Sequence, residues 1–174
     1  MSNWNKIFKP IVVLCSICIV ITGALAATNS VTKPIIDAAI AAAQEAARKE
    51  LIPEAASFEK IEGVEVENVS DIYKGDNGEV VITCAGKGYG GDITVMVAFT
   101  TEGTVKQIKI TEQTETAGLG SKIQSEASFV ESFSGLPAED FTVNDIAAIS
   151  GATISSKAVT AAVNAAIDAY ALIP

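Results

Sequence analysis

A long uncharged run near the N-terminus places the strongest constraint on how this chain can fold. No charged residue occurs from Pro10 to Thr32, and the most apolar part of the run covers residues 11–21. A helix that crosses the hydrocarbon core of a bilayer needs about 20 mainly apolar residues, because its backbone polar groups must be satisfied within the helix. The run meets this requirement, so we expect a transmembrane helix over residues 10–31, preceded by a short segment, residues 1–9.

The charges on either side of this run predict its orientation. Lys6 and Lys9 precede it, whereas Asp37 and Glu45 follow it. Basic residues favour the cytoplasmic side of a membrane, so we expect a cytoplasmic N-terminus and an extracytoplasmic C-terminal domain. Residues 24–26, Ala-Leu-Ala, also have the small-x-small pattern of a signal-peptide cleavage site. A secreted, cleaved form is therefore the alternative to the retained anchor that we expect.

An alanine-rich segment after the apolar run has the pattern of a helix. Pro34 is compatible with a first helical turn, and Pro53 marks the end of the pattern. Between them, apolar residues recur every three or four positions and form one stripe. We therefore expect residues 32–56 to form a helical stalk that continues the membrane helix and packs on the following domain. The stripe consists of Ile36, Ile40, Ala43, Ala47 and Leu51.

The middle of the chain has the pattern of an antiparallel sheet. Turn signals rich in glycine, asparagine and aspartate separate short segments of β-branched residues. In one segment, Val95, Val97 and Phe99 alternate with Thr94, Met96 and Ala98, as in a half-buried strand. We therefore predict an antiparallel meander of four strands, at residues 67–74, 79–85, 92–100 and 103–111.

Helical patterns return in the C-terminal part of the chain. Residues 121–133 are predicted to form a short helix, residues 141–149 a last short strand, and residues 154–172 a long helix. In the long helix, apolar residues from Ala158 to Tyr170 share one face. The predicted fold class is therefore α+β: a twisted, mainly antiparallel sheet with packed helices over residues 57–174, plus one N-terminal transmembrane helix.

Composition excludes several classes of function. The 174-residue chain has a net charge of −9 and no histidine. We therefore expect no nucleic-acid partner, and the commonest general base and metal ligand are missing. We assign no catalytic and no metal-binding residues, and favour a carrier of a cofactor. Cys15 and Cys18 lie in the apolar run and are interpreted as small apolar residues, and Cys84 as a buried free thiol.

A motif at the start of the last helix indicates a ligand site. Ser150, Gly151, Ala152 and Thr153 come directly before the helical pattern. The first N–H groups of a helix lack intrahelical acceptors, and the positive end of the helix dipole attracts anions. Such a terminus binds phosphate without a basic side chain. The alternative is an ordinary helix capped by serine or threonine.

The motif resembles the flavin-attachment site of a known family. Ser-Gly-Ala-Thr-x-x-Ser before an Ala/Val-rich helix is similar to the motif of the FMN-binding domain family, which includes the G subunits of Rnf-type ion-translocating ferredoxin:NAD oxidoreductases and the C subunits of sodium-pumping NADH:quinone reductases. Residues 115–120, Glu-Thr-Ala-Gly-Leu-Gly, resemble the family's ring-contacting loop, and residues 86–91 its glycine-rich turn. The three motifs occur in the family's order, which is more specific than one motif alone.

The resemblance implies a role for each matching residue. FMN is expected to be joined through its phosphate to Thr153. Leu119 is expected to lie against the ring face, with Thr116 at a ring edge and Glu115 either functional or simply solvated. Lys87, in the glycine-rich turn, is interpreted as an exposed lysine, and an electrostatic effect on the flavin is the alternative. The expected phosphate donors are the backbone N–H groups of Gly151 and Ala152 and the hydroxyls of Ser150 and Ser155.

Three further positions complete the comparison with the family. Gly118 and Gly120 can adopt positive φ and leave room for the ring. Ala117 stands where the family usually has proline. Ala147 stands where an aspartate is usual before the threonine, and Asp145 is not equivalent to it.

The function implied by the resemblance is electron relay at a membrane. We expect a flavoprotein subunit, anchored in the cell membrane, that passes electrons through covalent FMN within an ion-translocating ferredoxin:NAD oxidoreductase complex. The implied partners are the other membrane and peripheral subunits and a flavin transferase. Two alternatives stay open: a non-redox membrane-tethered scaffold, in which the threonine motif is only a helix cap, and a secreted flavin carrier.

Overall fold

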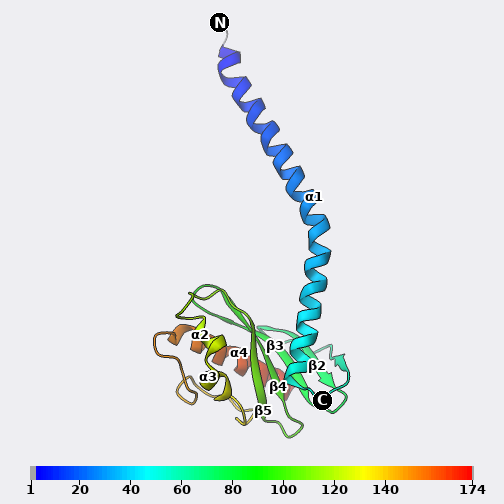
Figure 1. The fold of residues 1–174 in the computed structure, drawn as a ribbon, viewed down its shortest axis with the longest axis vertical. Coiled ribbons are helices and arrows are strands. Elements are labelled where there is room, and N and C mark those ends of the chain that lie inside the picture. Colours follow the sequence, from blue (N-terminus) through cyan, green and yellow to red (C-terminus); the bar gives the residue numbers. More distant parts are fainter. Residues whose placement is uncertain (1–2, 174) are drawn as a thin grey trace. The chain divides into compact units, whose positions relative to one another are not determined.

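The computed structural model describes residues 3–173, and its first element is one long helix. Helix α1, Asn3–Leu51, is continuous over 49 residues and contains Pro10 and Pro34 (Figure 1). From Phe8 onward it is long and apolar enough to cross a membrane, with a mean hydropathy of 2.6 over its most apolar window. The predicted membrane helix and the predicted helical stalk are therefore parts of the same helix. The chain divides into two compact units, with the division between Ala43 and Gln44.

The second unit is built on a five-stranded antiparallel sheet. Its strands follow one another in chain order, and each pairs with the next, as predicted for a meander. The first strand was not predicted, because three residues are too few to establish an alternating pattern. The strands are β1 (Phe58–Lys60), β2 (Val69–Gly75), β3 (Val80–Lys87), β4 (Asp92–Phe99) and β5 (Val105–Glu112).

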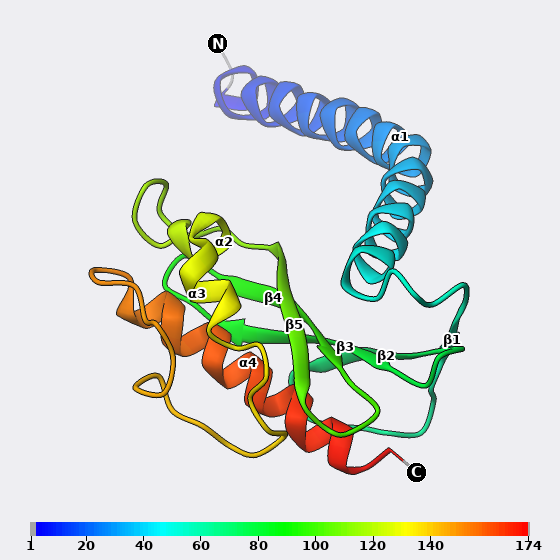
Figure 2. The ribbon, with the colours of Figure 1, turned by 60° about the horizontal axis from the view of Figure 1, so that its bottom comes forward.

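The main hydrophobic core lies between one face of this sheet and helix α4, Thr153–Ala171 (Figure 2). Val159, Ala162 and Val163 of α4 are fully buried, which confirms the predicted packing face of this helix. The helix approaches β3 very closely at Gly86. A Cβ atom at this position would lie 1.9 Å from the carbonyl oxygen of Ala158. Only glycine therefore allows this contact between helix and sheet.

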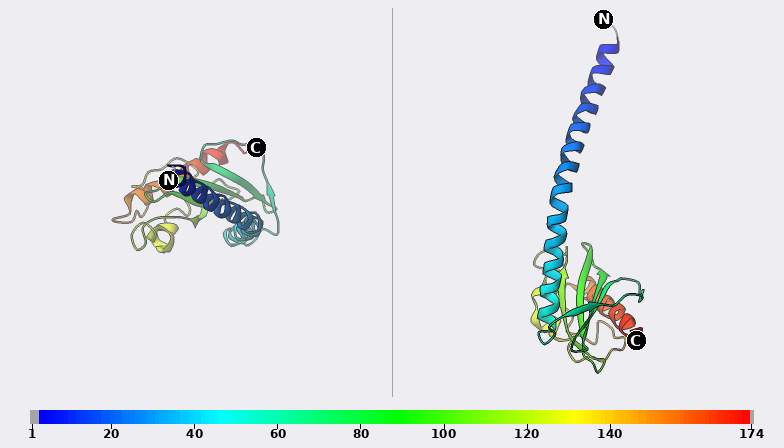
Figure 3. Two further views of the ribbon diagram at one scale, coloured as in Figure 1. Left: turned by 90° about the horizontal axis from the view of Figure 1, so that it is seen from above. Right: turned by 90° about the vertical axis from the view of Figure 1, so that its right-hand side faces the viewer.

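A smaller core covers the opposite face of β3 and β4. Met96 and Ala98 are fully buried there against Leu51 and Ile52, at the end of α1. Figure 3 shows the sheet between the last turns of α1 and helix α4. The prediction that β4 is half-buried was therefore wrong. Its Met96 face is covered because residues 44–51 belong to the same compact unit as the sheet.

The predicted helix over residues 121–133 is broken into two short helices. Helix α2 covers Lys122–Ser125 and helix α3 covers Ala127–Glu131, with an extended residue, Glu126, between them. In a continuous helix, Ile123 and Phe129 would point roughly 120° apart around the helix axis, because each residue turns the helix by about 100°. The break allows both side chains to be fully buried in one core.

The predicted strand over residues 141–149 is absent, and the segment forms turns. The Asp145 carboxylate accepts hydrogen bonds from the backbone N–H and the hydroxyl of Thr142, at 2.7 and 2.8 Å. These bonds lower the pKa of Asp145, with the backbone donor as the larger cause. Such local side-chain bonds compete with strand pairing. Ile146 still reaches the main core, which accounts for the strand-like sequence.

Candidate functional site

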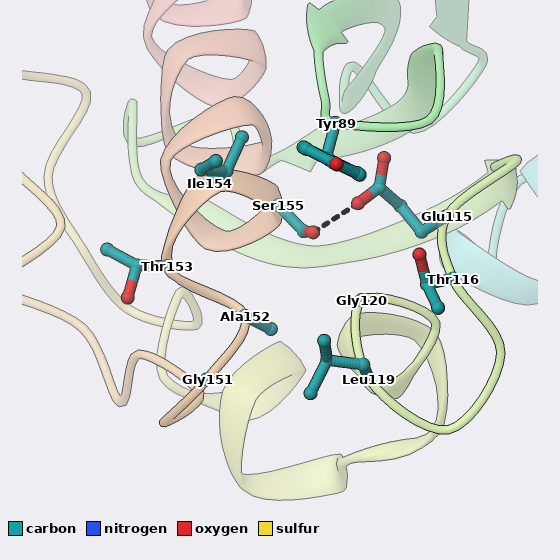
Figure 4. Close-up of a pocket in the computed structure, with 10 residues that line it drawn as sticks. All are labelled: Tyr89, Glu115, Thr116, Leu119, Gly120, Gly151, Ala152, Thr153, Ile154 and Ser155. Atoms are coloured by element: carbon teal, nitrogen blue, oxygen red, sulfur yellow. Dashed lines mark hydrogen bonds between the residues drawn. The ribbon is translucent and has the colours of Figure 1, made fainter.

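The three motif segments meet around one pocket at an end of the sheet. The pocket has a volume of about 450 Å³ and is lined by the hairpin between β3 and β4, the loop after β5 and the start of α4 (Figure 4). These segments are far apart in the sequence. The antiparallel meander brings the first two together, and the packing of α4 on the sheet adds the third.

The carboxylate of Glu115 links the three walls of the pocket. One of its oxygens, Oε2, accepts a hydrogen bond from the hydroxyl of Ser155, 40 residues along the chain in α4. Figure 4 shows these two side chains pointing toward each other. The other oxygen, Oε1, accepts a hydrogen bond of 2.8 Å from the backbone N–H of Gly90 in the β3–β4 hairpin.

The environment of Glu115 keeps this carboxyl group ionised. The side chain is only 9% exposed, and this burial alone raises its pKa. Hydrogen bonds from Ser155 and from the backbone of Gly90 and Tyr89 outweigh burial, so the net shift is a lowered pKa. Glu115 is therefore a structural link between the walls, and the solvated carboxylate considered from the sequence is not observed.

Two glycines of the loop after β5 have different roles. Gly118 has a φ of +75°, but Gly120 does not have a positive φ. A Cβ atom at Gly120 would lie 2.6 Å from Oε2 of Glu115 and 2.8 Å from Oγ of Ser155. Gly120 is therefore needed for the space it leaves at the Glu115–Ser155 contact, and the positive φ that glycine allows is not used there.

The start of α4 has no side-chain cap. Its N-cap residue is Ala152, and no side-chain hydrogen bond is made there. The preceding Gly151 has a φ of +81°, which turns the chain into the helix. The ordinary Ser/Thr-capped helix considered from the sequence is therefore not what forms. Without such a cap, the first helical N–H groups, from Thr153 to Ser155, lack intrahelical acceptors.

Two of the expected phosphate donors already have partners within the protein. The backbone N–H of Ala152 donates to the carbonyl of Ile149 at 3.0 Å. The hydroxyl of Ser155 donates to Glu115. Both residues line the pocket, but neither group is free to donate to an anion. Among the described residues, the N–H of Gly151, the hydroxyl of Ser150 and the N–H groups of the first helical turn, beside the exposed Thr153, have no partner within the protein.

Most of the predicted site residues line this pocket, and two do not. The structure brings together Thr153, Gly151, Ala152, Ser155, Glu115, Thr116, Leu119 and Gly120. Ser150 and Gly118 are exposed and are not among the residues lining the pocket.

Sequence reasoning missed two lining residues, Tyr89 and Ile154. Tyr89 is 75% exposed and Ile154 54% exposed, which is unusual for large apolar side chains in this domain. Tyr89 could have been found, because it is the one aromatic residue in the glycine-rich turn. Ile154 continues the apolar spacing of α4, so no local pattern indicated that it faces the pocket.

Models of two protein families match parts of this chain. Residues 88–168 match the FMN-binding domain family, and residues 1–51 match the RnfG N-terminal region. The chain is 33% identical to the G subunit of the Na(+)-translocating ferredoxin:NAD(+) oxidoreductase complex of Acetobacterium woodii, over 97% of this chain and 93% of that protein.

Two further relatives have corresponding names. The G subunit of the ion-translocating oxidoreductase complex of Methanosarcina acetivorans is 33% identical over 97% of this chain and 96% of that protein. The G subunit of the proton-translocating ferredoxin:NAD(+) oxidoreductase complex of Clostridium ljungdahlii is 32% identical over 96% of this chain and 93% of that protein. The chain therefore belongs to the family of G subunits of Rnf-type ion-translocating oxidoreductase complexes.

Proposed function

We propose that this chain carries FMN in a phosphoester bond to Thr153 and relays electrons as the G subunit of an ion-translocating ferredoxin:NAD oxidoreductase complex. The single observation that carries the proposal is the position of Thr153. Its side chain is exposed in the first turn of a helix that lacks a side-chain cap, at the edge of a pocket of about 450 Å³.

The start of α4 fits the phosphate of FMN. A phosphodiester at Thr153 keeps one negative charge, which the unpaired N–H groups and the positive end of the helix dipole stabilise. Gly151 has a φ of +81°, a conformation that residues with side chains rarely adopt, and a Cβ atom there would contact the Leu119 side chain at 3.4 Å. A small residue before the helix therefore keeps the backbone accessible to a phosphate.

The rest of the pocket fits a flat, largely apolar ring. Leu119 and Ile154 are about half exposed, and Tyr89 offers an aromatic face. The pocket volume also lies within the ~300–1,000 Å³ typical of small-molecule sites. When bound, FMN supplies the one- and two-electron chemistry that this chain's side chains lack. The residues around it orient the ring and shield it from water.

The charged Glu115 also bears on the electron chemistry. Its carboxylate is ionised and buried at the wall of the pocket. A fixed negative charge there disfavours additional negative charge on a neighbouring group. Because both carboxylate oxygens are held by hydrogen bonds, Glu115 has a constant charge near neutral pH. It therefore acts as a positioning residue for the pocket and as a fixed electrostatic influence on the flavin.

The proposal extends to location and partners. Lys6 and Lys9 precede the apolar part of α1, which supports a cytoplasmic N-terminus and a flavin domain on the extracytoplasmic side of the cell membrane. A flavin transferase is needed to make the phosphoester bond. Electrons then arrive from, and leave to, redox centres of other subunits of the complex.

Substitution of Thr153 tests the attachment site. The full chain is purified from its native membrane, and covalent flavin is detected by in-gel fluorescence after denaturation and by intact mass. The variant T153V should lose both signals because it lacks the hydroxyl, while T153S should retain part of them. The matched control is T116V, the same change at another exposed threonine of the pocket. It should retain covalent flavin.

Two results would count against the assignment. Covalent flavin in T153V would place the bond on another residue, and peptide mapping would identify it. Wild-type protein without flavin, from cells that assemble an active complex, would refute the proposed function itself and favour the scaffold. Folding of T153V is checked by resistance of the domain to limited proteolysis.

A further inference from the structure

The lysines of the extramembrane unit fall into two groups that differ in their pairing. Four of them form ion pairs with carboxylates: Lys49, Lys60, Lys106 and Lys109. Within the described residues, Lys74, Lys87, Lys122 and Lys157 form none. Carboxylates are not scarce, since the chain has 21 acidic and 12 basic residues. The unpaired lysines therefore need an explanation other than a shortage of partners.

Two of these lysines lie together beside the flavin pocket. Lys87, at the end of β3, and Lys157, in α4, line a second cavity of about 460 Å³. Ile154 lines this cavity and the flavin pocket, so the two cavities adjoin at its side chain. Neither lysine lines the flavin pocket itself. We call Lys87 and Lys157 the lysine pair.

Other groups add to the positive potential at this place. The lysine pair lies near the N-terminus of α4, which carries the positive end of the helix dipole. Lys122 lies next to the Leu119 wall of the flavin pocket, because its backbone N–H donates to the carbonyl of Leu119. The nearby carboxylates are Glu67, in the second cavity, Asp92, opposite Lys87 in the sheet, and Glu115, in the flavin pocket. None of these carboxylates forms an ion pair with these lysines.

The apolar side chains at the same place complete the pattern. The large apolar side chains exposed in the domain are Tyr89, Leu119, Ile154 and Leu172, and the first three line the flavin pocket. A bound ring accounts for these three, but it does not account for lysines outside the pocket. An apolar centre with charged residues at its edge is the usual anatomy of a protein interface.

We propose that the lysine pair forms a docking surface for an acidic face of the redox partner that exchanges electrons with the flavin. The inference rests on the proposed function, because it requires a flavin at Thr153. Complementary charge would bring the partner to the edge of the pocket and align it there, which increases the rate of productive encounters. The lysine pair places two positive charges that form no ion pair with any described residue at this edge of the pocket, although the whole chain has a net charge of −9.

Small redox reagents of opposite charge test the local potential. The flavin of the full chain in detergent is reduced, and its oxidation by anionic ferricyanide and by cationic hexaammineruthenium(III) is followed by stopped flow. For K87Q/K157Q, the ferricyanide rate should fall about 10-fold at 10 mM ionic strength and about 2-fold at 150 mM. The ruthenium rate should rise. A change in flavin potential would move both rates in one direction, so opposite changes identify a local charge effect.

The matched control removes the same charge elsewhere. Lys60 and Lys74 lie at the opposite end of the meander, where Lys74 pairs with the first residue of β3. That end is roughly 20 Å from Lys87, given ~3.3 Å per residue along β3. K60Q/K74Q should change both rates by no more than about 2-fold at 10 mM ionic strength. Equal effects of the two double variants would overturn the proposal.

The assembled complex tests the partner. In complexes that contain K87E/K157E, reduction of the covalent flavin should slow at least 5-fold and regain rate at high salt, whereas K60E/K74E should resemble the wild type. An unchanged rate in K87E/K157E would refute the docking surface. If the variant lost only its binding to anionic lipid vesicles and kept the normal rate of flavin reduction, the proposal would also be refuted. Loss of covalent flavin in K87Q/K157Q would instead assign the lysines to the phosphate or the transferase. Absence of flavin reduction in the wild type would refute the relay, which is a separate outcome.

Discussion

Replacement of Gly120 by alanine should disrupt the link between Glu115 and Ser155. A Cβ atom there would lie 2.6 Å from Oε2 of Glu115 and 2.8 Å from both Cβ of Glu115 and Oγ of Ser155. Carbon and oxygen atoms do not approach so closely without bonding, so at least one side chain must move. Because both are buried, movement means loss of their hydrogen bond.

The expected cost follows from the groups involved. Loss of a hydrogen bond to a charged group lowers the free energy of unfolding by about 1.5–3 kcal/mol. Overpacking adds about 1–3 kcal/mol, and the reduced entropy of the unfolded chain returns ~0.4–1 kcal/mol. We therefore expect G120A to destabilise the domain by about 2–5 kcal/mol and S155A by about 1.5–3 kcal/mol. The double variant loses the shared bond only once, so its cost should fall short of the sum by about 1.5–3 kcal/mol.

Pulse proteolysis over a urea series measures these values in the full chain in detergent. All variants are compared at the same content of flavin. The control is G118A, because a Cβ atom at Gly118 meets no atom within 4 Å although its φ is +75°. Its cost should arise from the backbone alone and should add to that of S155A. Additive costs for G120A and S155A, within about 0.5 kcal/mol, would refute the shared contact.

Three further predictions concern Glu115, Leu119 and the membrane topology. The pKa of Glu115 is lowered in the folded state, so its contribution to stability should be present above the ordinary pKa of 4.5 and be lost as the pH falls through the folded-state pKa. Urea unfolding of E115Q should lack this acid-dependent loss of stability. A pH profile of E115Q like that of the wild type would contradict the prediction. L119A should shift the flavin absorption spectrum or potential while in-gel fluorescence persists, because Leu119 lines the pocket without carrying the attachment; an unaltered spectrum and potential would remove Leu119 from the site. Protease added to cells with a permeable outer envelope should remove the flavin domain and leave an N-terminal stub, and protection there with digestion in inverted vesicles would reverse the proposed topology.

Local sequence patterns predicted the elements whose signals are repeated many times. The uncharged run and the alanine-rich stripe predicted α1, and the spacing of apolar residues predicted the buried face of α4. Glycine-containing turns between alternating segments predicted the strands from β2 to β5 and their order. Each of these signals is set by neighbouring residues, so it can be recognised without knowledge of the fold.

Where an apolar pattern was short, or indicated burial without fixing the type of element, the sequence did not determine the backbone conformation. The apolar residues around Ile146 indicate a strand, but Thr142 and Asp145 bond locally and form a turn that still buries Ile146. The apolar residues from Ile123 to Phe133 indicate one helix, although a break at Glu126 is what lets them reach one core. In both segments, burial accounts for the apolar residues, and the backbone conformation depends on other contacts.

The composition and order of the site motifs were visible in the sequence, but their contacts were not. Glu115 and Ser155 are 40 residues apart, and nothing in either motif indicates that their side chains bond. Likewise, the end of α1 buries the second face of β4, which alternation alone marked as exposed. Residue type and spacing therefore determined the elements and the chemistry available to them. Only the tertiary structure decided which donors are already engaged and which stay free, because that depends on segments brought together by packing of the sheet and helices.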